Sequence, residues 1–253
     1  MVRLFTGDYS RNDFKQWSAL DNKLATGGSI APGSYGGYGQ YPVAVICEDK
    51  DCGYVARMEV RAGDIVGGGN ERSEVSSYTF TSLTPIGSTF WYAFSVKFDP
   101  TYPLNSADYG WSVTNQWHDG VGSPTVAWGF NANAGRKTPT GYWSLYHTPQ
   151  DGPGIYLPDK LLLNVPMQRG NWIDVKMQIT WATNDSDGMV RAWVNGVRQT
   201  LLTGGQTFIG RTATPGADHM YYKEGLYRQK DVGYPTGIIY HGGYRQADTE
   251  NSL

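Results

Sequence analysis

Three separated segments carry polar side chains at every second position, the spacing at which a β-strand shows them on one face. In the first, Arg72 and Glu74 share a face, with Ser73 and Val75 behind them. The same rule aligns Thr114, Gln116 and His118 in the second segment, and His219, Tyr221, Lys223, Gly225 and Tyr227 in the third. The opposite faces carry the core-type side chains Trp117, Met220, Tyr222 and Leu226. Each segment therefore predicts a strand with one buried face and one polar face.

The side chains on the polar faces suit proton transfer beside a carboxylate. Arg72 can bind a carboxylate through two hydrogen bonds, and Gln116 can donate its amide protons. His118 can either donate a hydrogen bond or take a proton. A tyrosine has an ordinary pKa of about 10, so it acts as a base where neighbouring cations lower that pKa. Lys223 lies on the same predicted face as the tyrosines and could supply such a cation.

Each segment alone also fits a role without chemistry. Arg-Ser-Glu is typical of a surface strand with an ion pair, and Gln-Trp-His of a strand built around a core tryptophan. The tyrosines fit ordinary sheet packing, and Gly225 fits a bulge or a place of close backbone approach. His219 shares the polar face or is structural, whereas His147 and His241 lie beside turns and are predicted to be exposed loop residues. The combination of the three segments, rather than any one, favours a site.

Signatures of other chemistries are missing. The sequence lacks Gly-x-Ser-x-Gly, His-Glu-x-x-His and the phosphate-binding Gly-x4-Gly-Lys-Ser/Thr. Glu71 and Glu74 are three apart and face opposite sides of a strand, and Glu224 stands alone, which disfavours a glycosidase with paired carboxylates. Residues 184–188, Asn-Asp-Ser-Asp-Gly, lack the downstream glutamate of a calcium loop and predict a plain turn. No metal site is predicted, and calcium binding has no strong motif behind it.

The composition predicts the sheet-rich fold that these segments need. The 253 residues include 33 glycines and 13 prolines, which mark many turns, while 14% are aromatic and 17% charged. Helical bundles and disordered chains have other compositions. Two strands are predicted from apolar faces of period two: Phe90, Tyr92, Phe94, Val96 and Phe98 in one, and Ile173, Val175, Met177, Ile179 and Trp181 in the other.

Shorter patterns complete the predicted architecture. Residues 54–60 alternate as a strand, and Asn195-Gly196 predicts a type I′ hairpin between residues 189–194 and the strand that begins at Val197. The spacing of Phe14, Trp17, Leu20 and Leu24 predicts one short helix. Without repeats or a linker, residues 1–253 are predicted to form a single domain, an all-β jelly roll of two antiparallel sheets with little helix.

Charge and hydropathy limit the partners and the location. The net charge is −2 and no run of five Lys or Arg occurs, which argues against nucleic acid and anionic membranes. The longest apolar stretch, residues 43–47, is far too short to span a bilayer. Residues 1–9 lack the apolar centre of a signal peptide. We expect an extracellular or virion-associated protein that leaves its cell through virion assembly or lysis, or that has lost an original leader.

The sequence leaves the oxidation state of the two cysteines open. Cys47 and Cys52 flank Glu-Asp-Lys-Asp and could close a small disulfide loop, or both could be free thiols. Two cysteines are too few for a cysteine-rich zinc site.

Taken in order, the three segments resemble a known family. Arg-Ser-Glu at 72–74, Gln-x-His at 116–118 and Tyr-Tyr-Lys-x-Gly-x-Tyr at 221–227 resemble the motifs of jelly-roll polysaccharide lyases. Alginate lyases carry Arg-Thr/Ser-Glu, Gln-Ile/Val-His and Tyr-Phe-Lys-Ala-Gly-x-Tyr, and the present motifs look closer to the glucuronan and heparin lyase groups. The stretch 171–196 also resembles the tryptophan-bounded strand and Asn-Gly hairpin of concanavalin-like sandwiches. Glu224 stands where alginate lyases have Ala, so the substrate's identity is not carried over.

The resemblance implies β-elimination on a uronic acid polysaccharide in a groove on the concave sheet, with no organic cofactor. Removal of the C5 proton builds negative charge beside a carboxylate, which the enzyme must neutralise. The implied catalytic residues are Arg72, Gln116, His118, Tyr221 and Tyr227, and the implied substrate-binding residues are Lys223, Glu74 and His219. Alginate lyases would use the tyrosine at Tyr221 and heparin lyases the one at Tyr227; the motif slightly favours Tyr227.

Two other functions fit parts of the sequence. A non-catalytic carbohydrate-binding module, for example in a phage tail, would use the many Trp and Tyr side chains to stack on sugars. A hydrolase of the laminarinase kind on the same fold is disfavoured by the missing carboxylate pair. The specific uronic acid, internal or terminal cleavage and the oligomeric state are left open.

Overall fold

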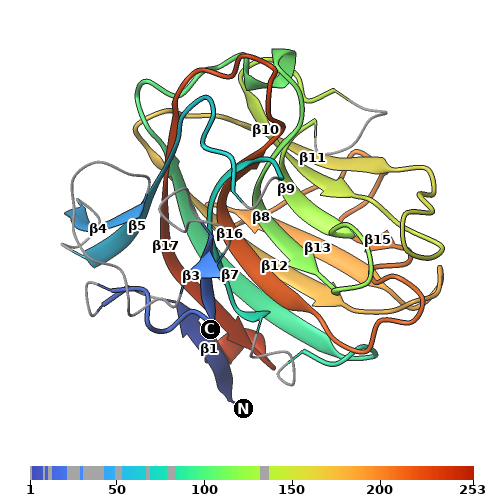
Figure 1. The fold of residues 1–253 in the computed structure, drawn as a ribbon. Helices are drawn as coiled ribbons and strands as arrows, with labels where there is room; N and C mark the ends of the chain where they lie inside the picture. The colour runs from blue at the N-terminus through green and yellow to red at the C-terminus, as the bar shows by residue number, and fades with distance from the viewer. Residues whose placement is uncertain are drawn as a thin grey trace.

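The protein is a jelly-roll β-sandwich of two antiparallel sheets (Figure 1). The computed structural model describes residues 2–7, 9–10, 13–21, 29–30, 43–48, 53–66, 69–78, 84–131 and 137–253. The all-β class and the two-sheet architecture predicted from the sequence are confirmed.

One sheet holds nine of the described strands. Its order is β14 (Val197–Arg198), β13 (Met189–Val194), β12 (Trp172–Thr180), β7 (Thr89–Phe98), β17 (Gly237–Ala247), β5 (Gly53–Val60) and β4 (Val43–Glu48), with β1 (Arg3–Gly7) paired to β17 and β15 (Phe208–Ile209) paired to β13. The second sheet runs β11 (Lys160–Pro166), β10 (Tyr142–His147), β9 (Val126–Phe130), β8 (Ser112–His118), β16 (Tyr221–Arg228), β6 (Glu71–Ser76), β2 (Ala19–Asp21) and β3 (Ser29–Ile30). Among the described residues, two 3-10 helices, η3 (Ser106–Asp108) and η4 (Glu250–Ser252), lie outside the sheets.

The two predicted core strands are the central strands β7 and β12, which pair along their whole length. Their period-two apolar residues are buried, as alternation requires. The predicted hairpin is also confirmed: Asn195 and Gly196 join β13 to β14 with φ values of 48° and 79°, the left-handed conformation of both central residues in a type I′ turn.

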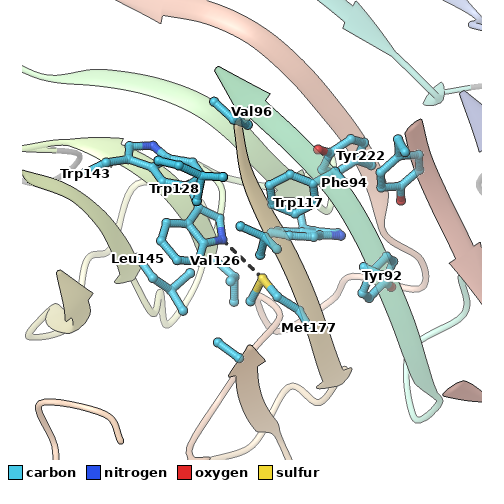
Figure 2. Close-up of a cluster of buried hydrophobic side chains, with 14 of the residues drawn as sticks. Tyr92, Phe94, Val96, Trp117, Val126, Trp128, Trp143, Leu145, Met177 and Tyr222 are labelled. Atoms are coloured by element: carbon cyan, nitrogen blue, oxygen red, sulfur yellow. Dashed lines mark hydrogen bonds between the residues drawn. The ribbon is translucent and has the colours of Figure 1, made fainter. Parts of the chain in front are cut away.

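Aromatic side chains from both sheets fill the space between them (Figure 2). Trp128 stacks on Trp143 with ring centroids 4.3 Å apart, and its indole N–H points to the sulfur of Met177 at 3.2 Å. Tyr222 lies against Tyr244 of the facing sheet at 3.8 Å, almost parallel. Many of the aromatic residues that the composition counted are therefore core residues.

The predicted helix near the start of the chain is wrong. Residues 13–18 form turns, in which the Trp17 N–H donates to the Phe14 carbonyl at 2.9 Å, and Leu20 belongs to strand β2. Phe14, Trp17 and Leu20 are nevertheless buried, and Trp17 packs against Tyr222 and Tyr244. Their spacing reflects contact with the sandwich core rather than helical periodicity; Leu24 lies outside the described residues.

The cysteine question falls outside the described part of the chain, and the membrane question is answered within it. Cys52 is not described, nor is the side chain of Cys47, so both readings of that pair stand. Among the described residues, neither helix has the length and hydropathy that crossing a membrane requires.

Candidate functional site

The three polar segments lie on neighbouring strands. Strand β16 is hydrogen-bonded to β6 on one side and to β8 on the other. The register places Lys223 opposite Gln116, Tyr221 opposite His118 and Tyr227 opposite Arg72. Segments that span some 155 positions in sequence thus meet on one face of one sheet.

The side chains on the opposite face of these strands point into the core, as the alternation predicts, with one exception on the polar side. Ser73, Val75, Trp117, Met220, Tyr222 and Leu226 are all buried. Thr114 does not share the face of Gln116: its hydroxyl accepts a hydrogen bond from the indole of the core residue Trp143 at 2.9 Å. The pairing of β8 with β9 shifts register between Val113 and Asn115, and this bulge breaks the alternation that the prediction assumed.

Glu74 is the centre of the polar face. Its buried carboxylate accepts from the amide of Gln116 at 2.5 Å and from the ammonium of Lys223 at 3.0 Å. Arg72 Nη1 lies 3.8 Å from the same carboxylate. Asp21 of β2 adds a second carboxylate, 3.7 Å from Lys223 and 3.9 Å from Arg72. Two cations and two carboxylates thus form one network.

Tyr227 lies at one end of this network. The guanidinium of Arg72 lies over its ring, 4.0 Å from the centroid. The amide of Asn70 donates to its hydroxyl at 3.2 Å, and Trp111 packs edge-on against the ring at 4.9 Å. Arg72 is therefore a cation in direct contact with Tyr227, at the face of its ring.

His118 and Tyr221 form a stacked pair at the other end. Their ring centroids are 5.2 Å apart and nearly parallel, and Tyr78 meets Tyr221 edge-on at 5.1 Å. Burial lowers the pKa of His118 to about 4, so the imidazole is neutral near pH 7. Its Nδ1 accepts the Gly120 N–H at 2.8 Å, which leaves the proton on Nε2. Burial raises the pKa of Tyr221, which keeps its proton at neutral pH.

The remaining titratable candidates have other partners or surroundings. His219 precedes β16, bridges to Pro85 and contacts the carboxylate of Asp218. The prediction of exposed loop positions for His147 and His241 is wrong: both are buried within strands, His147 in β10 and His241 in β17. Glu224 is fully buried on the back of β16. Turn-forming residues next to a histidine in the sequence therefore do not imply that the histidine is exposed.

Sequence reasoning missed several neighbours of the site. Asn70 continues the alternation of Arg72 and Glu74, so its position was a usable signal. Asp21, Tyr78 and Trp111 reach the site through strand pairing or loop packing between distant segments, which no local pattern encodes.

Metal-ligating side chains do not converge within the described ranges, where no group of three or more His, Cys, Asp or Glu could hold an ion. The loop at residues 184–188 is a turn closed by the side chain of Asn184, which accepts from the N–H groups of Ser186 and Asp187. The side chains on the polar face include two cations, two hydrogen-bond donors and two tyrosine hydroxyls.

Comparison with known proteins identifies similar sequences and folds. A family model described as polysaccharide lyase matches residues 9–245. An endo-β-1,4-glucuronan lyase from the fungus Trichoderma reesei has 13% identity and a TM-score of 0.65, covering 98% of this chain and 96% of that one. A family 7 alginate lyase, with one tyrosine replaced by phenylalanine and product bound, has 16% identity and a TM-score of 0.57, covering 90% and 93%.

A third similar structure has a different activity. The catalytic domain of a glycoside hydrolase family 131 protein from Coprinopsis cinerea has 13% identity and a TM-score of 0.58, covering 99% of this chain and 96% of that one. None of the curated protein sequences matches. At such identities the structural likeness shows a common fold, and a fold alone does not fix the chemistry.

Proposed function

Because the chain belongs to the polysaccharide lyase family, we propose that it cleaves a uronic-acid-containing polysaccharide by β-elimination. The observation that carries this proposal is the meeting of Gln116, Lys223 and Arg72 with the His118–Tyr221 pair on one sheet face. Two of the proteins with a similar fold are a glucuronan lyase and an alginate lyase, which supports a uronate substrate. Such polymers occur outside cells, where we expect the protein to act.

The first requirement is to neutralise the uronate carboxylate. The Gln116 amide, the Lys223 ammonium and the Arg72 guanidinium are the donors available on this face. They are held by Glu74, which we assign a positioning role, since its carboxylate is buried behind them. The Nε2–H of His118 adds a fourth donor, because its Nδ1 is already an acceptor. In this scheme His118 binds the carboxylate and does not take the C5 proton.

Tyr221 then performs the proton transfers. At neutral pH only the small ionised fraction of Tyr221 reacts: the phenolate takes the C5 proton, the electron pair of that C–H bond forms the C4=C5 double bond, and the C4–O4 bond breaks. The departing O4 keeps the bonding electrons and receives the same proton from Tyr221. Tyr227 lies six residues away, about 20 Å along the strand, so the two tyrosines serve different sugars. We choose Tyr221 because it neighbours His118 and is nearer to the Gln116–Lys223 pair.

Ultraviolet absorbance of the unsaturated product tests the activity. The protein is incubated separately with glucuronan, alginate, heparin, heparan and hyaluronan. New absorbance with at least one polymer is expected. A flat trace with all five would contradict the proposal, and release of saturated reducing ends would point to a hydrolase instead.

Two single variants test the choice of tyrosine. We expect Tyr221→Phe to lose about 10³-fold or more in kcat, because it removes the group that moves the proton, and Tyr227→Phe to retain most of it. Tyr240→Phe is the matched control, since that hydroxyl lies on the other sheet and donates to Asp99 at 3.0 Å. Full activity in Tyr221→Phe with loss in Tyr227→Phe would reverse the assignment.

The pH profile gives an independent check on the same step. Since burial raises the pKa of Tyr221, the phenolate fraction grows as pH rises from neutral into the alkaline range. We expect kcat to rise over that range, measured by initial rates of product absorbance. A profile that falls above neutral pH would argue against a phenolate base.

A further inference from the structure

A buried polar cluster lies directly behind the site. The carboxyl group of Glu224 accepts from the Tyr9 hydroxyl at 2.6 Å and from the Tyr222 hydroxyl at 3.0 Å. The amide of Asn115 donates in turn to the Tyr222 hydroxyl at 2.7 Å. All four side chains are fully buried or nearly so. The donors converge on Glu224, which is the arrangement that an ionised carboxylate requires.

The facing sheet contributes His241 to the same cluster. Its Nε2 donates to the carbonyl oxygen of Gly225 at 3.1 Å, because a carbonyl can only accept. Its Nδ1 lies 3.5 Å from the amide nitrogen of Asn115 and 3.9 Å from Glu224 Oε2. Strand β17 therefore holds the backbone of β16 from behind, at the residue that follows Glu224.

Gly225 is where β16 is most constrained. Its φ is +149°, and a Cβ there would lie 2.1 Å from the Ser73 carbonyl oxygen and 2.6 Å from the Glu74 Cα. The pairing of β16 with β8 shifts register between Glu224 and Tyr227. This irregular stretch follows Lys223 and precedes Tyr227, so it determines how the two side chains are spaced on the polar face.

We propose that Glu224, Tyr9, Tyr222 and His241 are positioning residues for the reaction, which fix the bulge of β16 and with it Lys223 and Tyr227. The inference rests on the proposed function and concerns residues that never touch substrate.

The cluster is coupled to protons. Burial raises the pKa of Glu224 to about 7, although the hydrogen bonds from Tyr9 and Tyr222 act to lower it. Burial lowers the pKa of His241 to about 3. The groups that face the carboxyl are Tyr9, Tyr222, Tyr244, Asn115 and His241, none of them charged at neutral pH. Protonation of Glu224 turns an acceptor oxygen into a donor, so the phenol O–H that donated to this oxygen loses its acceptor. The ionised form therefore holds the bulge in the observed arrangement.

Histidine side-chain ¹⁵N NMR tests the cluster without substrate. The chain has only four histidines, which keeps the spectrum assignable. We expect His241 to stay neutral with its proton on Nε2, and its shifts to change with an inflection near pH 7 as Glu224 ionises. Glu224→Gln should remove the inflection. Tyr9→Phe should raise it by about one to two pH units, because the carboxylate loses one donor.

Lyase activity tests the positioning role with the same variants. The ratio of wild-type to Glu224→Gln kcat should fall by up to about tenfold per pH unit below that inflection, because only the wild type loses its ionised carboxylate. Tyr9→Phe should move this decline to higher pH. Tyr92→Phe is the control: it removes a buried hydroxyl that accepts from Trp181 at 2.8 Å, and should leave the profile in place.

The outcomes separate this inference from the proposed function. An unchanged pH profile in both Glu224→Gln and Tyr9→Phe, or an equal shift in Tyr92→Phe, would overturn the positioning role while lyase activity stands. A wild type without lyase activity on any polymer would overturn both, even if the NMR inflection is found.

Discussion

His118 shows how one hydrogen bond selects between two chemical roles. The sequence left it as either donor or base, and the Gly120 N–H on Nδ1 at 2.8 Å assigns the remaining proton to Nε2. Glutamine in the same place could donate from its amide but could not act as a base. The two roles therefore predict different variants to be active.

We predict that His118→Gln retains kcat/KM within about tenfold of wild type, whereas His118→Ala loses about 10²- to 10³-fold, the loss expected for one donor to a developing negative charge. Initial rates on the cleaved polymer measure both. Equal and near-complete loss in both variants would instead make His118 the base.

Strand β16 is the element that joins the polar face to the core. Its odd-numbered residues from Tyr221 to Tyr227 line the site, and its even-numbered residues enter the core. Gly225 breaks the regular strand where it approaches β6 most closely. A side chain there would clash with backbone atoms of β6, which cannot move without displacing Glu74.

We predict that Gly225→Ala lowers the free energy of unfolding by about 3 kcal/mol or more, from backbone strain together with overpacking. Gly141→Ala is the matched control, because Gly141 has a φ of +81° and open space around its Cβ position, so it incurs only the strain, about 1 kcal/mol. Urea unfolding of both variants measures the difference. Equal losses would show that the contact with β6 does not matter.

The same element shows what sequence could predict. Alternation found the two faces of β16 and the core faces of β7 and β12, because both faces of each strand have distinct environments. It failed for Thr114, where a bulge reverses the side chain, and for Phe14 to Leu20, which form turns and a strand and whose Trp17 packs against Tyr244. It could not find Asp21 beside Lys223 or Tyr9 beside Glu224, because these contacts join segments distant in sequence.

At the scale of the whole molecule, buried histidines make folding sensitive to acid. Burial lowers the pKa values of His118 and His147 to about 4 and that of His241 to about 3, from 6.5. A lowered pKa stabilises the fold above pH 6.5, and this stability is lost as pH falls, because the unfolded chain binds protons that the folded one does not. At pH 5 each histidine lowers the free energy of unfolding by on the order of 2 kcal/mol, and the partly exposed His118 lowers it by less.

Glu224 acts in the opposite direction, which allows a test by difference. Its pKa is raised from 4.5 to about 7, so its contribution to stability is fully present below pH 4.5 and is lost as pH rises through 7. Acidification from pH 7.5 to 5 therefore raises the contribution of Glu224 to the free energy of unfolding by on the order of 2 kcal/mol. This gain roughly offsets the loss from one of the three histidines. We predict that the urea midpoint of Glu224→Gln falls more steeply than that of the wild type over this range. Parallel slopes would mean that the buried carboxyl does not titrate near neutral pH, and would remove the proton coupling on which the positioning cluster depends.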